Sequence, residues 1–102
     1  MAKPEVVQSY QQATAFQPGT SVTLTNASTS YPVIPANTGR FQAWITNIHA
    51  SAVIYLYLSA TGAQVGKGIP LQPNAQIQFT TYVGAVSAIS LTAGATLAIA
   101  EI

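Results

Sequence analysis

Apolar residues in this chain recur at every second position, in short segments separated by turn residues. Phe41, Ala43 and Ile45 form one such set, and the same alternation recurs in residues 21–25, 52–58, 75–83, 85–91 and 95–102. Successive side chains of a strand point to opposite faces, so this period predicts half-buried β-strands. The sequence therefore predicts an all-β fold: an antiparallel β-sandwich or jelly roll of about seven or eight short strands.

The clearest expected element is a hairpin of residues 40–47 and 52–58, joined by the four-residue loop 48–51. This loop length would place Ile45 opposite Ile54 and keep the aliphatic partners on one face of the hairpin. A loop with an odd number of residues would mix the two faces. The parity of the loop therefore favours the hairpin.

A second hairpin is expected from residues 85–91 and 95–102, with Gly94 supplying a left-handed backbone conformation in the loop. The segments Tyr31–Pro35 and Gly68–Pro73 are rich in proline. Proline cannot donate a backbone hydrogen bond, so these two segments are predicted to lie at sheet edges or in connections.

The first hairpin would present an aromatic face made of Trp44, Tyr55 and Tyr57, with Gln42 beside them. Three interpretations remain open. The face is covered by the same chain, or it is a subunit interface, since aromatic residues anchor interface cores. The third is a platform on which sugars stack, with Gln42 and Arg40 near enough to hold hydroxyl groups.

Residues 1–19 are polar and irregular, and are expected to form an N-terminal arm ahead of one sandwich domain, 20–102. Their apolar members are the candidate arm contacts: Val6, Val7, Tyr10 and Phe16. The arm is either an unattached terminus or a segment that crosses to a neighbouring subunit or a support surface.

Charged residues make up 5% of the chain, against roughly a quarter in ordinary soluble domains. They are Lys3, Glu5, Arg40, Lys67 and Glu101. Three scattered basic residues cannot form a phosphate-binding patch, so nucleic-acid binding is not expected. The longest strongly apolar run, 52–58, is far shorter than the ~20 residues that span a bilayer, so no membrane partner is expected either. Scarce charge indicates either a surface that other molecules cover or one whose solubility rests on the abundant Thr, Ser, Gln and Asn side chains, and the first is the more informative explanation.

Catalysis needs titratable groups that converge, and this chain has one His, no Cys, and two acidic residues, both Glu. We therefore expect no catalytic site, metal site or cofactor, and no enzyme. His49 is expected to be exposed in the loop of the first hairpin. A metal site where symmetry copies of His49 meet is the alternative.

The second part of the chain, about residues 40–102, has a pattern of strand and turn residues that resembles a known class. It runs Arg40-x-x-Ala43-x-Ile45-x-Asn47, Val53-x-Tyr55-Leu56, Gly68-Ile69-Pro70-Leu71-x-Pro73 and Gly84-Ala85-Val86-x-Ala88-Ile89, and closes with Leu97-x-Ile99-x-Glu101. This resembles small β-rich virion proteins of tailed bacteriophages, such as capsid decoration (cement) proteins and head-fibre or tail-tip modules. The resemblance implies a sandwich or jelly-roll subunit, often trimeric, without a catalytic site.

These observations lead to one main hypothesis and two alternatives. The main one is a virion structural protein that binds the outer shell of major capsid protein as a homo-oligomer, with a trimer favoured. It would act on the capsid exterior after assembly in the host cytoplasm. The alternatives are a receptor- or carbohydrate-binding module of a fibre or tail tip, and a subunit of a tail tube or filament.

Overall fold

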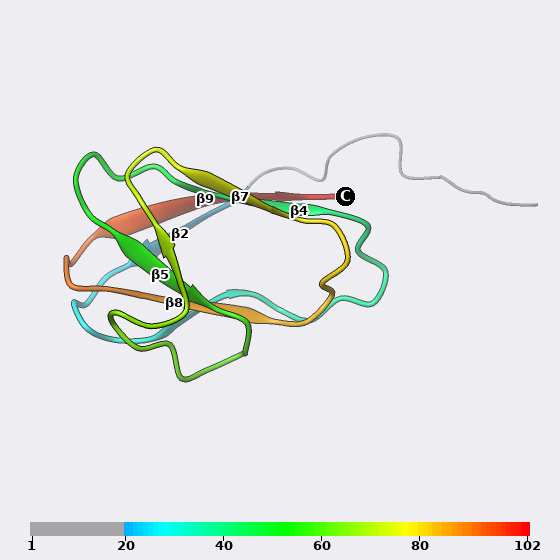
Figure 1. Cartoon of the computed structure of the whole chain (residues 1–102), viewed down its shortest axis with the longest axis horizontal. Helices are drawn as coiled ribbons and strands as arrows, with labels where there is room; N and C mark the ends of the chain where they lie inside the picture. The colour runs from blue at the N-terminus through cyan, green and yellow to red at the C-terminus, as the bar shows by residue number, and fades with distance from the viewer. Residues whose placement is uncertain (1–19) are drawn as a thin grey trace, which may run out of the picture.

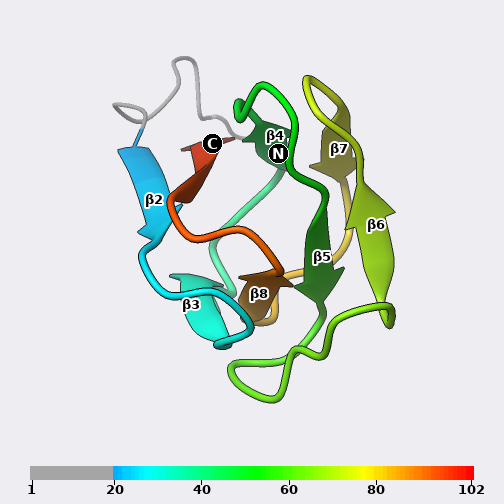
Figure 2. The ribbon, with the colours of Figure 1, turned by 90° about the vertical axis from the view of Figure 1, so that its left-hand side faces the viewer.

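The computed structural model describes residues 20–102 as two four-stranded antiparallel sheets packed face to face (Figure 1). The sheet orders are β2-β9-β4-β7 and β3-β8-β5-β6. The strands are β2 (Thr20–Leu24), β3 (Tyr31–Ile34), β4 (Ala43–Asn47), β5 (Ile54–Tyr57), β6 (Ile69–Leu71), β7 (Gln76–Phe79), β8 (Val86–Ser90) and β9 (Ala95–Glu101). The predicted all-β sandwich is thus confirmed. Seen along the sandwich, β2 and β3 form one side, and β7 and β6 form the other (Figure 2).

The core lies between the sheets and is built from the alternating apolar positions. In β4 every second residue is buried, and the two sheets interleave their inward side chains. The largest fully buried apolar side chains are Leu24, Ile45, Ile54, Leu56, Leu97 and Val86. Ile77 and Phe79 of β7 face this core as the alternation predicts, but β7 ends at Phe79 instead of continuing to residue 83.

Both predicted hairpins are wrong, because their strands lie in different sheets. β4 pairs with β7 and β9, while β5 pairs with β6 and β8. Likewise, β8 belongs to one sheet and β9 to the other. A connection that crosses between facing sheets keeps apolar residues directed at the core, as a hairpin would. The alternation is therefore the same in both arrangements, and loop parity cannot distinguish them.

The amide of Asn47 holds the connection between β4 and β5, and it is fully buried. Its Nδ2 donates to the carbonyl oxygens of Ala52 at 2.7 Å and Leu71 at 2.9 Å, and its Oδ1 accepts from the backbone N–H of His49 at 2.9 Å. His49 is half-buried instead of exposed. Its Nδ1 accepts from the backbone N–H groups of Ser51 and Ala52, so it shapes the loop.

Several local predictions are confirmed. Gly94 has a φ of 83°, in the left-handed region that an L side chain rarely adopts. The two proline-rich segments form β3 and β6, which are the edge strands of the second sheet. In the part of the chain that the structure describes, no helix is long and apolar enough to cross a membrane.

Candidate functional site

The outward side of the sheet β2-β9-β4-β7 is the candidate site, and we call it the outer face. The strand registers identify its residues, because positions that alternate with the core side chains point outward. They are Ser21, Thr23, Trp44, Thr46, Gln76, Gln78, Thr96, Ala98 and Ala100. Each of these described residues is uncharged, so the face combines an aromatic ring with neutral polar groups.

An open depression of about 470 Å³ crosses the outer face. Trp44 lies beside the small side chains of Ala98 and Ala100, and residues of all four strands line the depression. Because alanine side chains are short, the flank of the indole is left higher than its neighbours on β9. This arrangement provides a hollow that an apolar or neutral polar group could fill.

Neutral hydrogen bonds connect the polar side chains around the depression. Gln76 donates through Nε2 to Thr46 Oγ1 at 3.0 Å, and Gln78 donates through Nε2 to Gln42 Oε1 at 3.3 Å. Gln42, a predicted platform residue, thus lies next to the strand that carries Trp44. These amides keep further donors and acceptors for a partner.

The predicted aromatic cluster does not form, because its members belong to different sheets. Trp44 is on β4 in the first sheet, whereas Tyr55 and Tyr57 are on β5 in the second, directed to the opposite side of the sandwich. The cluster depended on pairing β4 with β5, and that pairing is absent. Of the expected platform residues, Trp44 and Gln42 remain together.

The outer side of the second sheet is partly covered by its own chain. The loop between β5 and β6 lies on that side (Figures 1 and 2), and its Ala63 N–H donates to Ser30 Oγ at 3.1 Å. Ser87 and Ile89 of β8 face the same side as Tyr55 and Tyr57, yet they are buried. The chain's own cover therefore reaches Tyr55, which is half-buried, but leaves Tyr57 exposed.

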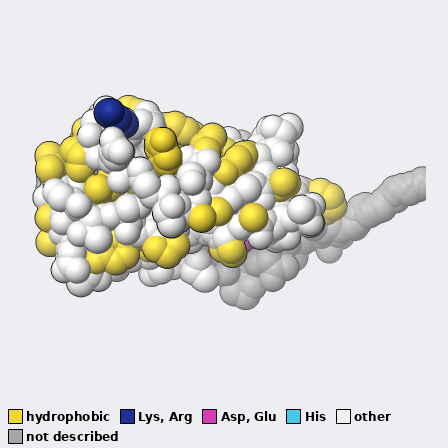
Figure 3. Space-filling view, turned by 90° about the horizontal axis from the view of Figure 1, so that it is seen from below, with side chains coloured by type: hydrophobic (Ala, Val, Ile, Leu, Met, Phe, Trp, Pro, Cys, Tyr) yellow, Lys and Arg dark blue, Asp and Glu magenta, His cyan; other side chains and the backbone are white. Residues whose placement is uncertain are grey.

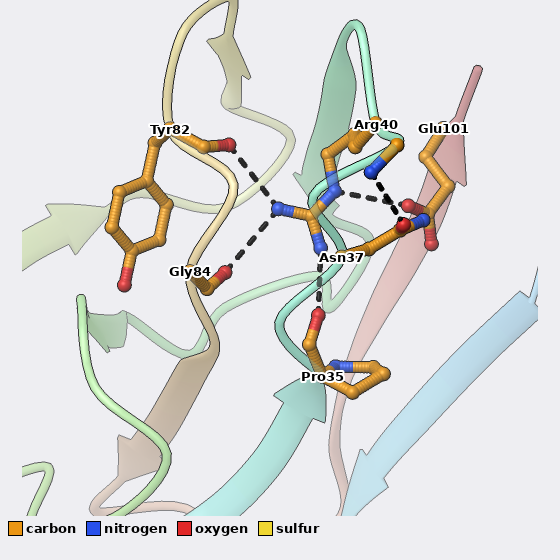
Figure 4. Close-up of polar contacts among 7 residues, drawn as sticks. Pro35, Asn37, Arg40, Tyr82, Gly84 and Glu101 are labelled. Atoms are coloured by element: carbon orange, nitrogen blue, oxygen red, sulfur yellow. Dashed lines mark hydrogen bonds and ion pairs between the residues drawn. The ribbon is translucent and has the colours of Figure 1, made fainter.

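Arg40, expected near a sugar platform, is buried at one end of the sandwich and is turned inward (Figure 4). Its Nε pairs with Glu101 Oε1 at 2.9 Å. Its other nitrogens donate to the carbonyl oxygens of Pro35 at 2.7 Å, and of Tyr82 and Gly84 at 3.2 Å. A guanidinium suits this task because its donors form a rigid planar fork. Arg40 therefore joins three segments and does not serve the outer face.

Inward burial of Arg40 leaves the described surface with very little charge. Within residues 20–102, Lys67 is exposed in a loop, and the Glu101 side chain is 25% exposed in its pair with Arg40. The view onto the second sheet's side shows hydrophobic and uncharged polar atoms mixed, with basic atoms at one corner (Figure 3).

The sequence interpretation missed Thr46, Gln76, Gln78, Ala98 and Ala100 as members of the site. Alternation in β7 already placed Gln76 and Gln78 on one face of this strand and Ile77 and Phe79 on the other face. Their position beside Trp44 required the strand order, which alternation does not contain. The predicted arm contacts, Val6, Val7, Tyr10 and Phe16, lie outside the residues that the structure describes.

Residues 20–102 contain no group of three or more His, Cys, Asp or Glu side chains placed to hold a metal ion. The described side chains of the outer face offer an indole for stacking, and neutral amides and hydroxyl groups for hydrogen bonding. Comparison of the chain with protein-family models, curated proteins and solved structures finds no match.

Proposed function

We propose that this chain is a non-enzymatic structural subunit that assembles with copies of itself and stabilises a virion shell as a decoration protein. The observation that carries the proposal is the scarcity of charge on the two sides of the sandwich. The resemblance of residues 40–102 to small β-rich virion proteins supplies the setting. The major capsid protein would be the second partner.

The proposed mechanism is the sum of many neutral contacts. Burying a charge costs several kcal/mol unless a partner compensates it, whereas neutral polar and apolar groups dock at much smaller cost. A stable interface covers about 800 Å² on each partner, which is only about a tenth of the surface of a small protein. A subunit whose faces carry uncharged groups can therefore be covered on more than one side and can bridge shell subunits.

The full chain is expected to be oligomeric in size-exclusion chromatography with light scattering, and to keep the same mass in 0.1 M and 1 M salt. Salt screens charge–charge contacts, which the outer face does not offer. A monomer at all protein concentrations that also fails to bind capsid shells would refute the proposal. Long polymers in the electron microscope would favour the tail-tube or filament alternative.

One observation favours a carbohydrate-binding module as a second candidate: the depression beside Trp44, with glutamine amides around it. Neutral sugars stack on aromatic rings and bond to amides. For this function we expect Trp44→Ala to reduce binding on a neutral-glycan array at least tenfold. Tyr57→Ala, which alters the opposite side of the sandwich, is the control and should leave binding unchanged. An array without binding by the unaltered chain would eliminate this candidate.

A further inference from the structure

The two sheets differ in how their edge strands are protected. In the second sheet both edge strands contain proline, Pro32 in β3 and Pro70 in β6. In the first sheet the edge strands β2 and β7 contain neither proline nor charge. Natural proteins use proline and charge to prevent an edge from pairing with another chain. Both edges of the first sheet lack this protection.

The hydrogen-bond pattern identifies which groups are directed outward on β7. Asn47 N–H donates to the carbonyl oxygen of Ala75 at 2.9 Å, so residues in phase with Ala75 bond to β4. In an antiparallel strand, the N–H and C=O groups of one residue point to the same side, and those of the next residue point to the other side. Ile77 and Phe79 therefore bond to β4, while Gln76 and Gln78 direct their N–H and C=O groups away from the sheet.

The same argument applies to β2. Ile48 N–H donates to the carbonyl oxygen of Thr96 at 3.1 Å, so Thr96 directs its backbone groups to β4. Its opposite residue on β2, Thr23, then directs its own groups away from β9, as does Ser21 two residues earlier. Each of the two edges thus presents two residues whose backbone N–H and C=O groups point outward.

The apolar side chains at the two edges are also incompletely covered. Val22 lies between Ser21 and Thr23, and Ile77 lies between Gln76 and Gln78; both pack against the core but are only partly buried. A strand added at either edge would cover them further. The edges therefore lack both backbone partners and complete apolar cover within the described residues.

We propose that β7 of one copy pairs with β2 of the next, so that the sheet continues from subunit to subunit. The inference rests on the proposed self-assembly and names its contact. The pairing is antiparallel, with Ser21 opposite Gln78, Val22 opposite Ile77 and Thr23 opposite Gln76. Each of the two polar pairs exchanges two backbone hydrogen bonds, and the apolar pair closes over the core between them.

The direction of the strands permits this pairing in a closed ring. Neighbours in the order β2-β9-β4-β7 are antiparallel, so β2 and β7 run in opposite directions. Rotation about an axis along the strands keeps those directions, and the next copy's β2 continues the alternation. Such a heterologous contact closes into a ring when the rotation closes. A two-fold contact of β7 with β7 would leave the unprotected edge of β2 unused.

Two matched pairs of variants test the contact on the full chain. Gln76→Pro and Ser21→Pro each remove one outward N–H, whereas Gln76→Thr and Ser21→Thr change the same side chains and keep it. We expect each proline variant to weaken self-association at least tenfold by light scattering, and each threonine variant to keep the oligomer mass. Circular dichroism of the separate variants checks that they fold.

Mixing the two proline variants gives the decisive result. Gln76→Pro keeps an intact β2 edge and Ser21→Pro keeps an intact β7 edge, so a mixture should form a heterodimer that does not grow.

Oligomers unchanged in both variants would overturn the edge contact while leaving self-assembly in place. Loss of assembly in Gln76→Pro alone would overturn it in favour of β7–β7 pairing. An unaltered chain that is monomeric at all protein concentrations would overturn the edge contact, and one that also fails to bind capsid shells would refute the proposed function itself. An unfolded variant is replaced by Gln78→Pro or Thr23→Pro, which remove the other outward N–H of the same edge.

Discussion

Replacing Arg40 with alanine is expected to lower the free energy of unfolding by about 3 kcal/mol or more. The guanidinium pairs with Glu101 and donates to three backbone carbonyl oxygens, and Arg40 is 5% exposed. Its removal leaves the Glu101 carboxylate partly buried without this partner, and it disconnects the segments that follow β3 and β7 from β9. Breaking a buried ion pair from one side costs more than the pair contributes, because the remaining charge has lost its compensation.

Thermal unfolding followed by circular dichroism measures this effect, with an expected decrease in Tm of roughly 15 °C for a domain of this length. Lys67→Ala is the matched control, because Lys67 is basic but exposed in a loop, and should change stability by less than about 0.5 kcal/mol. Arg40→Lys should lie between the two, since an ammonium cannot reproduce the planar fork. Equal stability of Arg40→Ala and Lys67→Ala would show that the network does not hold the sandwich together.

Replacing Asn47 with alanine is expected to have a comparable effect, about 3 kcal/mol of lost stability. The side chain is fully buried and satisfies the carbonyl groups of Ala52 and Leu71 and the N–H of His49. An unsatisfied buried polar group costs about 1–3 kcal/mol, and the shorter side chain adds a cavity. The loss should be concentrated in the crossing between β4 and β5.

Urea unfolding measures the change, and Thr46→Ala is the control in the same strand. Thr46 points outward and its bond to Gln76 is exposed, so its loss should cost less than about 1 kcal/mol. Asn47→Asp should be nearly as damaging as Asn47→Ala, because a carboxylate would face two carbonyl oxygens. If Asn47→Asp were as stable as the unaltered chain, the two Nδ2 bonds would not be holding this connection.

The strands and the fold class could be predicted because alternation is a local property. Ile45 and Ile54 face the core whether β4 and β5 are neighbours in one sheet or lie in opposite sheets. The pairing could not be predicted for the same reason, since a crossing connection and an even hairpin loop preserve the same alternation. The buried amide of Asn47 is the feature that stabilises the crossing, and an asparagine near a loop is equally typical of an ordinary turn.

The candidate site was half predictable for a related reason. Trp44 and Gln42 share a strand face by spacing alone, and they remain together in the structure. Tyr55 was grouped with them through the expected hairpin, and it lies on the other side of the sandwich. Burial of Arg40 depends on the convergence of Pro35, Tyr82 and Glu101, which are far apart in the sequence and meet only once the sheets are assembled.

Hydrogen exchange of the edge amides tests most directly whether copies of this chain cover one another along the sheet β2-β9-β4-β7. The N–H groups of Ser21, Thr23, Gln76 and Gln78 point away from the sheet and have no hydrogen-bond partner in the neighbouring described strand. In dilute protein these amide hydrogens should therefore exchange quickly. The account predicts that these four amides become protected at high protein concentration, and that Gln76→Pro abolishes the protection at Ser21 and Thr23. Fast exchange at all four positions in the assembled protein would contradict it.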